Sequence, residues 1–216
     1  MKNYQPTTLG FALLGLIHGG AMTGYDLRKV FAETALGNYS SSPGAIYPAL
    51  ARLEEHGLIE GREDNTIKLR PKKLYRPSDE GRHIFRQWLL QDVSTDDMRG
   101  HLDELMLPFA FHSVLDSAEA TRSFLEGLSN GLSEYIGELK EQSELIPDEA
   151  PIHSRRALEA GLVQYEALAH WAHKARRHFE GKAKPIPRRE ARTRKVEWMK
   201  CRVLGVKLSA LPGGRM

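Results

Sequence analysis

The stretch SPGAIYPALARLEEHG, residues 42–57, decides the fold of this chain. Ser42 followed by Pro43 predicts a helix start, because a serine side chain caps free amides and proline fits the first turn. Apolar residues then recur at helical spacing and predict one buried face. They are Ile46, Leu50 and Leu53. Gly57 predicts the end of the helix.

The face opposite this apolar stripe has an unusual composition. It carries the large aromatic Tyr47 and also Pro48, which lacks an amide hydrogen. Its other residues are small, apart from one arginine: Ser42, Gly44, Ala45, Ala51 and Arg52. Small residues let a backbone approach base edges, while Tyr and Arg side chains can bind phosphate, a thymine methyl group or guanine. Ser42 and the free amides of the first turn are expected to bind a phosphate. We therefore predict that this face binds DNA.

The neighbouring sequence predicts the elements that support such a helix. The expected elements are helices over 9–17, 24–33 and 79–91, and strands over 58–62 and 72–76. The expected helix caps are Thr7 or Thr8, Thr23, Ser42 and Ser78. Three helices, a basic hairpin and a closing helix are the plan of a winged helix-turn-helix.

Further residues are candidates for the DNA interface. Cations of the hairpin are expected to bind the flanking backbone: Lys68, Arg70, Lys72 and Lys73. Tyr25 is another candidate, although we expect its ring to be half-buried between helices. Plainer interpretations exist, because Tyr47 could pack against the wing and Arg52 could pair with Glu55. The lysine pair could be a solvated strand edge that blocks aggregation.

Beyond a polar linker at 92–100, the pattern is wholly helical. We expect a short helix interrupted at Pro108 and then two long helices, the first capped by Ser117. Their wide apolar faces cannot cover each other completely, so we expect a homodimer. The expected interface residues are Leu125, Leu128, Leu132, Leu158, Leu162, Tyr165, Leu168, Ala169 and Ala172.

Charge divides the chain into three zones. Residues 1–92 carry 12 Lys and Arg against 10 Asp and Glu, residues 93–180 carry 8 against 16, and residues 181–216 carry 11 against 2. Because the acidic middle repels nucleic acid, a DNA-binding surface belongs in the head or the tail. The tail is either a solvated extension or an auxiliary arm on the DNA backbone.

Composition excludes several other classes of protein. The 41% hydrophobic and 27% charged composition is that of an ordinary globular protein. The single cysteine, Cys201, excludes an internal disulfide and fits a reducing cytosol, so we expect a cytoplasmic protein. The longest apolar run, 9–17, is too short to span a membrane. It could form the core of a signal peptide, but the next residues continue a folded pattern.

An enzyme is the main rival interpretation. Glu166, His170 and His173 share one helical face and could ligate zinc. No cysteine pair or HExxH motif joins them, so solvated histidines are the favoured interpretation. No nucleophile elbow, P-loop or dinucleotide motif is present. We expect no catalytic residues, no cofactor and no metal.

Three motifs resemble the PadR family of bacterial winged-helix transcription regulators. They are TGYDL (23–27), IYPALARLEEHGLI (46–59) and KKLYRPSDEGRHIFRQWL (72–89). The helical half resembles, by pattern alone, the dimerisation domain of the larger PadR-type and virulence-activator-type members. Two departures stand out. Pro77 and Ser78 replace the usual Leu-Thr pair, and Pro71 lies in the wing.

The resemblance implies a mainly α fold in three parts. Residues 1–92 would be the DNA-binding domain, 93–180 a helical dimerisation and effector domain, and 181–216 a flexible basic tail. It also implies a repressor that binds double-stranded DNA as a homodimer on a pseudo-palindromic operator. A small-molecule effector would occupy an interdomain cleft, unless the aromatic residues proposed to line it are ordinary core. They are Phe11, Trp88, Phe109 and Phe111. The alternative is an architectural or protein-interaction module that binds DNA without sequence preference or does not bind it at all.

Overall fold

The computed structural model describes residues 4–39, 42–64, 72–100, 102–147 and 149–180. These residues form two compact units, the first ending at Trp88 and the second beginning at Leu89. Among the described helices, none combines the length and the apolar character needed to cross a membrane.

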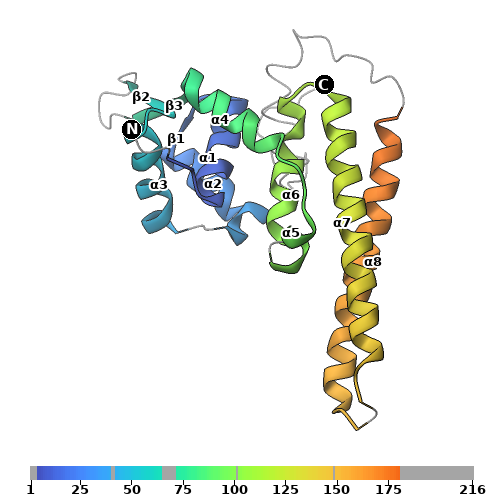
Figure 1. Cartoon of the computed structure of the whole chain (residues 1–216). Coiled ribbons are helices and arrows are strands. Elements are labelled where there is room, and N and C mark those ends of the chain that lie inside the picture. The colour runs from blue at the N-terminus through green and yellow to red at the C-terminus, as the bar shows by residue number, and fades with distance from the viewer. Residues whose placement is uncertain (1–3, 40–41, 65–71, 101, 148, 181–216) are drawn as a thin grey trace, which may run out of the picture. The chain divides into compact units, whose positions relative to one another are not determined.

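The first unit consists of helices and a small sheet (Figure 1). Its elements in chain order are α1 (Thr8–Gly19), β1 (Met22–Thr23), α2 (Gly24–Ala32), the 3-10 helix η1 (Ala35–Asn38), α3 (Pro43–Glu55), β2 (Ile59–Asp64), β3 (Lys72–Pro77) and α4 (Asp79–Leu89). This order confirms the predicted winged helix-turn-helix plan.

Hydroxyl side chains begin these helices as the sequence predicts. Thr7 Oγ1 accepts from the Gly10 amide at 3.3 Å, and Thr23 Oγ1 accepts from the Asp26 amide at 3.2 Å. The Ser78 hydroxyl accepts a hydrogen bond from the Gly81 amide, in the first turn of α4, at 2.9 Å. Each contact satisfies a backbone donor that has no partner inside its helix.

Helix α1 is the centre of the first unit. Every residue from Gly10 to Ile17 is buried, so this helix is surrounded by the rest of the unit. Against it and its neighbours pack fully buried side chains from α2, α3 and α4. They are Leu27, Phe31, Ile46, Leu50, Leu53 and Phe85. The predicted buried stripe of α3 is therefore confirmed.

The sheet has three antiparallel strands in the order β1-β3-β2. Strand β3 is central: its Tyr75 lies opposite Met22 of β1 and Gly61 of β2. The sequence predicted β2 and β3 but not the two-residue β1. Strand β1 ties the chain between α1 and α2 to the wing.

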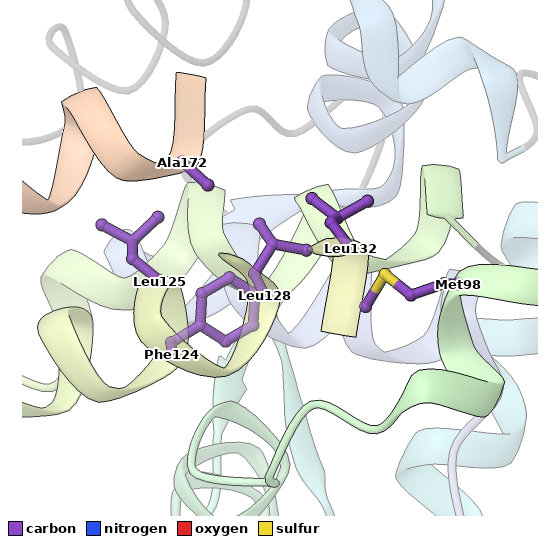
Figure 2. Packing of buried hydrophobic residues seen from close by; sticks show 6 residues of the cluster. All are labelled: Met98, Phe124, Leu125, Leu128, Leu132 and Ala172. Atoms are coloured by element: carbon purple, nitrogen blue, oxygen red, sulfur yellow. The ribbon is translucent and has the colours of Figure 1, made fainter. Parts of the chain in front are cut away.

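The second unit is helical throughout its described residues. Its elements are α5 (Thr95–Gly100), α6 (Leu102–Phe111), the 3-10 helix η2 (His112–Val114), α7 (Ala118–Glu144) and α8 (Ile152–His178). Helices α7 and α8 lie side by side as a long antiparallel hairpin (Figure 1). Figure 2 shows the core that α5, α7 and α8 form together. The residues in this view are Met98, Phe124, Leu125, Leu128, Leu132 and Ala172.

Two predictions about this unit are wrong. The expected polar linker at 92–100 contains helix α5, whose Met98 is fully buried and whose Arg99 donates to Glu138 of α7 at 2.7 Å. The interruption expected at Pro108 is absent, because α6 continues through this residue to Phe111. The predicted Ser117 cap of α7 is confirmed, since its hydroxyl accepts from the Ala120 amide at 3.1 Å.

Candidate nucleic-acid interface

Helix α3 turns its unusual face to the solvent. Tyr47 is 46% exposed, and most of its companions on this face are exposed too. The exposed companions are Ser42, Gly44, Pro48, Ala51 and Arg52, whereas Ala45 is half-buried. The same helix buries its apolar stripe completely, so the two faces have separate roles. An exposed face of small, tyrosyl and arginyl residues matches what a major-groove helix requires.

The first turn of α3 corrects one expectation. The Gly44 amide donates to Ser42 Oγ at 3.2 Å, and the Ala45 amide donates to the Ser42 carbonyl at 3.0 Å. Pro43 has no amide hydrogen. The first-turn amides that we expected to be free for a phosphate therefore already have acceptors. The positive end of the helix dipole still attracts an anion here.

The Tyr47 ring rests on the start of α2. A Cβ atom built on Gly24 would lie 2.7 Å from Tyr47 Cε1, closer than real side chains approach. A side chain at position 24 would therefore displace the Tyr47 ring. The plainer interpretation of Tyr47, packing against its own chain, holds for one side of the ring. Its exposed part is free to face a ligand.

Tyr25 is more exposed than we expected. Its side chain is 59% exposed rather than half-buried, and the Arg28 guanidinium lies 5.5 Å from the ring centroid. A cation over an aromatic face is weakly attractive at such an exposed site. Tyr25 and Arg28 together form a cationic and aromatic surface beside Gly24. Sequence analysis singled out Tyr25 and missed Arg28.

Arg52 has no ion pair with any described residue, including the Glu55 that we considered as a partner. Its side chain is exposed near the end of α3. An unpaired guanidinium on this face keeps its donors available for a phosphate or a guanine.

The wing presents its two described lysines differently. Lys72 is exposed and has no ion pair among the described residues. The Lys73 ammonium instead donates to Glu54 Oε2 of α3 at 2.7 Å. This hydrogen bond, opposed by partial burial, raises the pKa of Lys73 above its ordinary value. Lys68 and Arg70 lie outside the described residues, as does Pro71.

Sequence analysis missed a second exposed cation on β3. Arg76 lies four residues after Lys72 and is exposed like it. Side chains alternate between the faces of a strand, so residues two and four apart share a face. The alternation of side chains along a strand was the sequence signal that would have placed Lys72 and Arg76 on one face.

The proposed dimer interface needs correction. Four of its nine residues have little or no exposed surface in a single chain: Leu125, Leu128, Leu132 and Ala172. They form the core between α7, α8 and α5, so they have no surface left for a second copy. The other five, Leu158, Leu162, Tyr165, Leu168 and Ala169, are half-buried along α8 and stay a prediction.

The four aromatic residues proposed for an effector cleft pack within two different units. Phe11 stacks on Trp88 in the first unit, with ring centroids 4.4 Å apart. In the second unit, Phe109 meets Trp171 edge to face at 5.2 Å, and Phe111 is fully buried. These contacts are those of ordinary core. An effector site lined by these residues stays a prediction.

His112 is a buried histidine in the second unit. Its ring lies 4.7 Å from that of Phe124, and neither ring nitrogen has a partner in normal hydrogen-bond geometry among the described residues. Burial lowers the pKa of His112 to about 4, opposed weakly by the nearby Leu89 backbone. The imidazole is therefore neutral at physiological pH.

The zinc interpretation gains no support from α8. Glu166 instead forms an ion pair with Lys140 of α7, with 2.7 Å between Glu166 Oε1 and Lys140 Nζ. Within the described ranges, no three His, Cys, Asp or Glu side chains come together as a metal site would require.

Comparisons with known proteins place the first unit in a family. The transcriptional regulator PadR-like family matches residues 13–87. The negative transcriptional regulator PadR of Bacillus subtilis is 32% identical over 120 residues, which cover 56% of this chain and 65% of that protein. The transcriptional regulator YqjI of Escherichia coli is 39% identical over 56 residues, which cover 26% of this chain and 27% of YqjI. The chain thus spans less than two thirds of either relative.

Solved structures of the same relative are also similar. A crystal structure of Bacillus subtilis PadR in complex with operator DNA is 25% identical, with a TM-score of 0.38 over 80% of this chain and 99% of that one. Its complex with p-coumaric acid is 24% identical, with a TM-score of 0.35 over 81% of this chain and 96% of that one. The family match lies in the winged-helix unit described above. Residues 13–87 of this chain thus match the PadR-like family of transcriptional regulators.

Proposed function

We propose that this chain is a sequence-specific DNA-binding transcriptional repressor that acts as a homodimer on a pseudo-palindromic operator. The observation that carries the proposal is the division of α3 into a buried apolar stripe and an exposed face of small residues with Tyr47 and Arg52. The proposal also rests on the relative from Bacillus subtilis, a negative regulator with a known operator complex. We further propose that the protein acts in the cytoplasm and has no catalytic activity.

In this proposal α3 enters the major groove and reads base edges. Lys72 and Arg76 of the wing contact the flanking backbone and supply affinity that depends on salt. A small-molecule effector is part of the proposal, since the Bacillus relative binds p-coumaric acid.

Selection of bound duplexes from a random library tests the proposal. A homodimer with two equivalent α3 helices is expected to enrich a two-fold symmetric consensus, with half-sites about one helical turn, roughly 34 Å, apart. Sedimentation equilibrium should give twice the 24.4 kDa mass of the chain. A library that shows no enrichment contradicts sequence-specific binding, and a monomer at binding concentrations contradicts the symmetric operator.

A second candidate is an architectural module that binds DNA without sequence preference. The 11 Lys and Arg against 2 Asp and Glu in residues 181–216 favour it, because such a tail attracts any polyanion. Competition between the selected duplex and a scrambled duplex at one salt concentration separates the two. A repressor should prefer its operator by a factor of roughly 10³ or more, whereas an architectural module should bind both duplexes alike.

A further inference from the structure

A single carboxylate joins the recognition helix to both strands of the wing. Glu54 lies at the end of α3, where its Oε2 atom accepts a hydrogen bond from Lys73 Nζ of β3 at 2.7 Å. Its Oε1 atom accepts from the Gly61 amide of β2 at 3.2 Å. Glu54 is therefore in contact with both strands of the wing, and it holds each through a different oxygen.

The close approach of these groups depends on the absence of a side chain at Gly61. A Cβ atom at this position would overlap Lys73 Cε and lie 2.7 Å from Glu54 Oε1. Any larger residue would thus force apart the carboxylate and the ammonium. The strand, the helix and the lysine meet at one point because β2 has a glycine there.

Lys73 lies on the face of β3 that carries Tyr75, although its own side chain is 45% exposed. On β3 it shares a face with Tyr75, which is buried, and its ammonium lies 5.7 Å from the centroid of the Tyr75 ring. Lys72 is the preceding residue on the strand, so its side chain points to the opposite face. Both lysines are exposed, but their surroundings differ: Lys73 is held by Glu54, whereas Lys72 has no ion pair among the described residues.

We propose that Glu54 is a positioning residue, which fixes the wing against the recognition helix through Lys73 and Gly61. Lys73 serves this contact and does not bind a DNA phosphate. The inference rests on the proposed DNA-binding function and deepens it. Helix and wing must meet the duplex together, so a wing held in advance loses less conformational freedom on binding. Glu54 thereby raises affinity although its own charge repels DNA.

The two lysines supply a matched pair of variants. Lys72→Gln and Lys73→Gln remove the same charge from adjacent positions of one strand. The probe is the duplex obtained by selection, and affinity is measured between about 50 and 200 mM salt, the range over which phosphate contacts dominate. Loss of one phosphate contact flattens the slope of log affinity against log salt by about 0.9. We expect this change for Lys72→Gln, and a weaker affinity with an unchanged slope for Lys73→Gln.

Glu54→Gln tests the proposal, because charge and positioning predict opposite changes in affinity for DNA. Removal of a carboxylate near a polyanion should strengthen binding if charge alone matters. Positioning instead predicts weaker binding, on the order of two- to fivefold, as expected when a partly exposed ion pair is lost. Glu55→Gln is the matched control, because Glu55 is the next residue, is exposed and has no ion pair among the described residues. It should bind as tightly as the unmodified chain or more tightly.

The double variant Glu54→Gln with Lys73→Gln completes the test. If both residues act through one contact, the double variant should bind no more weakly than the weaker single variant. The inference is overturned if Glu54→Gln binds as tightly as Glu55→Gln, or if Lys73→Gln flattens the salt slope as much as Lys72→Gln. If Glu54→Gln does not fold, the comparison of the two lysines decides. A chain that binds no duplex at all would overturn the proposed function itself, which is a different outcome from either of these.

Discussion

Arg52 is the residue whose surroundings most clearly suit contact with DNA. It is exposed on the outer face of α3 and has no ion pair within the described part of the chain. Without a carboxylate partner, the Arg52 guanidinium contributes no ion pair to the stability of the folded chain. Its donors are thus available to an external partner at little cost in stability.

Arg52→Ala should weaken binding to the selected duplex by about 1–3 kcal/mol if the guanidinium contacts a base. The melting temperature and the oligomeric state should not change, because the side chain makes no ion pair within the chain. Titration of a labelled duplex measures the effect. Arg86→Ala is the control, since Arg86 is exposed on α4 outside the candidate face. Equal affinity for both variants would remove Arg52 from the interface.

His112 makes the stability of the protein depend on pH. The pKa of its imidazole is about 4 in the folded chain and about 6.5 when unfolded. Above pH 6.5 both states are neutral, and the folded state has its full stability. As the pH falls from 6.5 to 4, the unfolded chain gains a proton that the folded chain cannot bind, so stability decreases by up to about 3 kcal/mol.

His112→Phe should remove this part of the acid sensitivity, since a phenyl ring does not titrate and suits neighbours such as Phe124. Urea unfolding at pH 7.5 and pH 4.5 gives the stability difference for each chain, and that difference should shrink in the variant. His170→Phe is the control, because His170 is exposed. If all three chains lose the same stability, burial of His112 does not control the acid response.

Sequence patterns predicted which residues of α3 face inward and which face outward. They did not separate Lys72 from Lys73, because the sequence does not show which face of the strand meets a carboxylate. They also placed Tyr25 between helices, whereas its ring extends into solvent. For the two lysines the missing information was Glu54, a partner distant in the chain.

At the scale of elements, α3 contains a proline where a helix normally forms a hydrogen bond. Pro48 lies five residues after the first residue of α3, so the bond from its position to Gly44 is absent. Both residues are exposed, on the face that we propose for DNA.

Pro48→Ala should therefore stabilise α3, by about 1–3 kcal/mol, because alanine restores the amide donor and suits a helix interior. Affinity for the selected duplex should fall, since the ring is removed from the outer face. Chemical unfolding and duplex titration measure the two effects. Pro43→Ala is the control for stability, because the first helical position has no such bond to lose. A variant that binds as well as the unmodified chain would exclude Pro48 from the interface.

Helix starts were the most predictable elements. Thr7, Thr23, Ser42, Ser78 and Ser117 all cap the helices that they were expected to cap. Two elements were missed for different reasons. Strand β1 is two residues long and exists only because β3 pairs with it, so no local signal announces it. Helix α5 had a signal, because Ser94 and Asp97 form a capping pair, with 2.7 Å between Ser94 Oγ and Asp97 Oδ2.

At the scale of the whole chain, charge is distributed unevenly. The acidic middle and the basic tail would act on a duplex with opposite signs. The tail, residues 181–216, lies outside the described residues. Its role is therefore argued from charge alone.

Deletion of residues 181–216 should lower affinity for the operator and for a scrambled duplex by the same factor. The slope of log affinity against log salt should also become flatter, because counterion release depends on the number of cations and not on the base sequence. A tail of the same length with Gln in place of Lys and Arg is the control for length. If the slope is unchanged in both chains, the tail does not contact the DNA backbone.

The oligomeric state stays a prediction. Periodicity correctly marked the apolar faces of α7 and α8, but it could not assign the residues to a partner. Met98 of α5, in a segment expected to be a linker, packs on the same core as Leu128 and Leu132. The apolar surface that suggested a second copy is therefore partly covered within one chain.

The contact between Gly24 and Tyr47 has a consequence for how binding preferences change in such a protein. A single methyl group at position 24 would push the aromatic ring outward from beneath, so a residue that never meets the duplex would alter what the ring can touch. Directed evolution that randomises only the solvent-facing positions of α3 would overlook this route. Libraries should vary positions 24 and 47 together, because a smaller side chain at position 47 becomes useful only when the side chain at position 24 is larger.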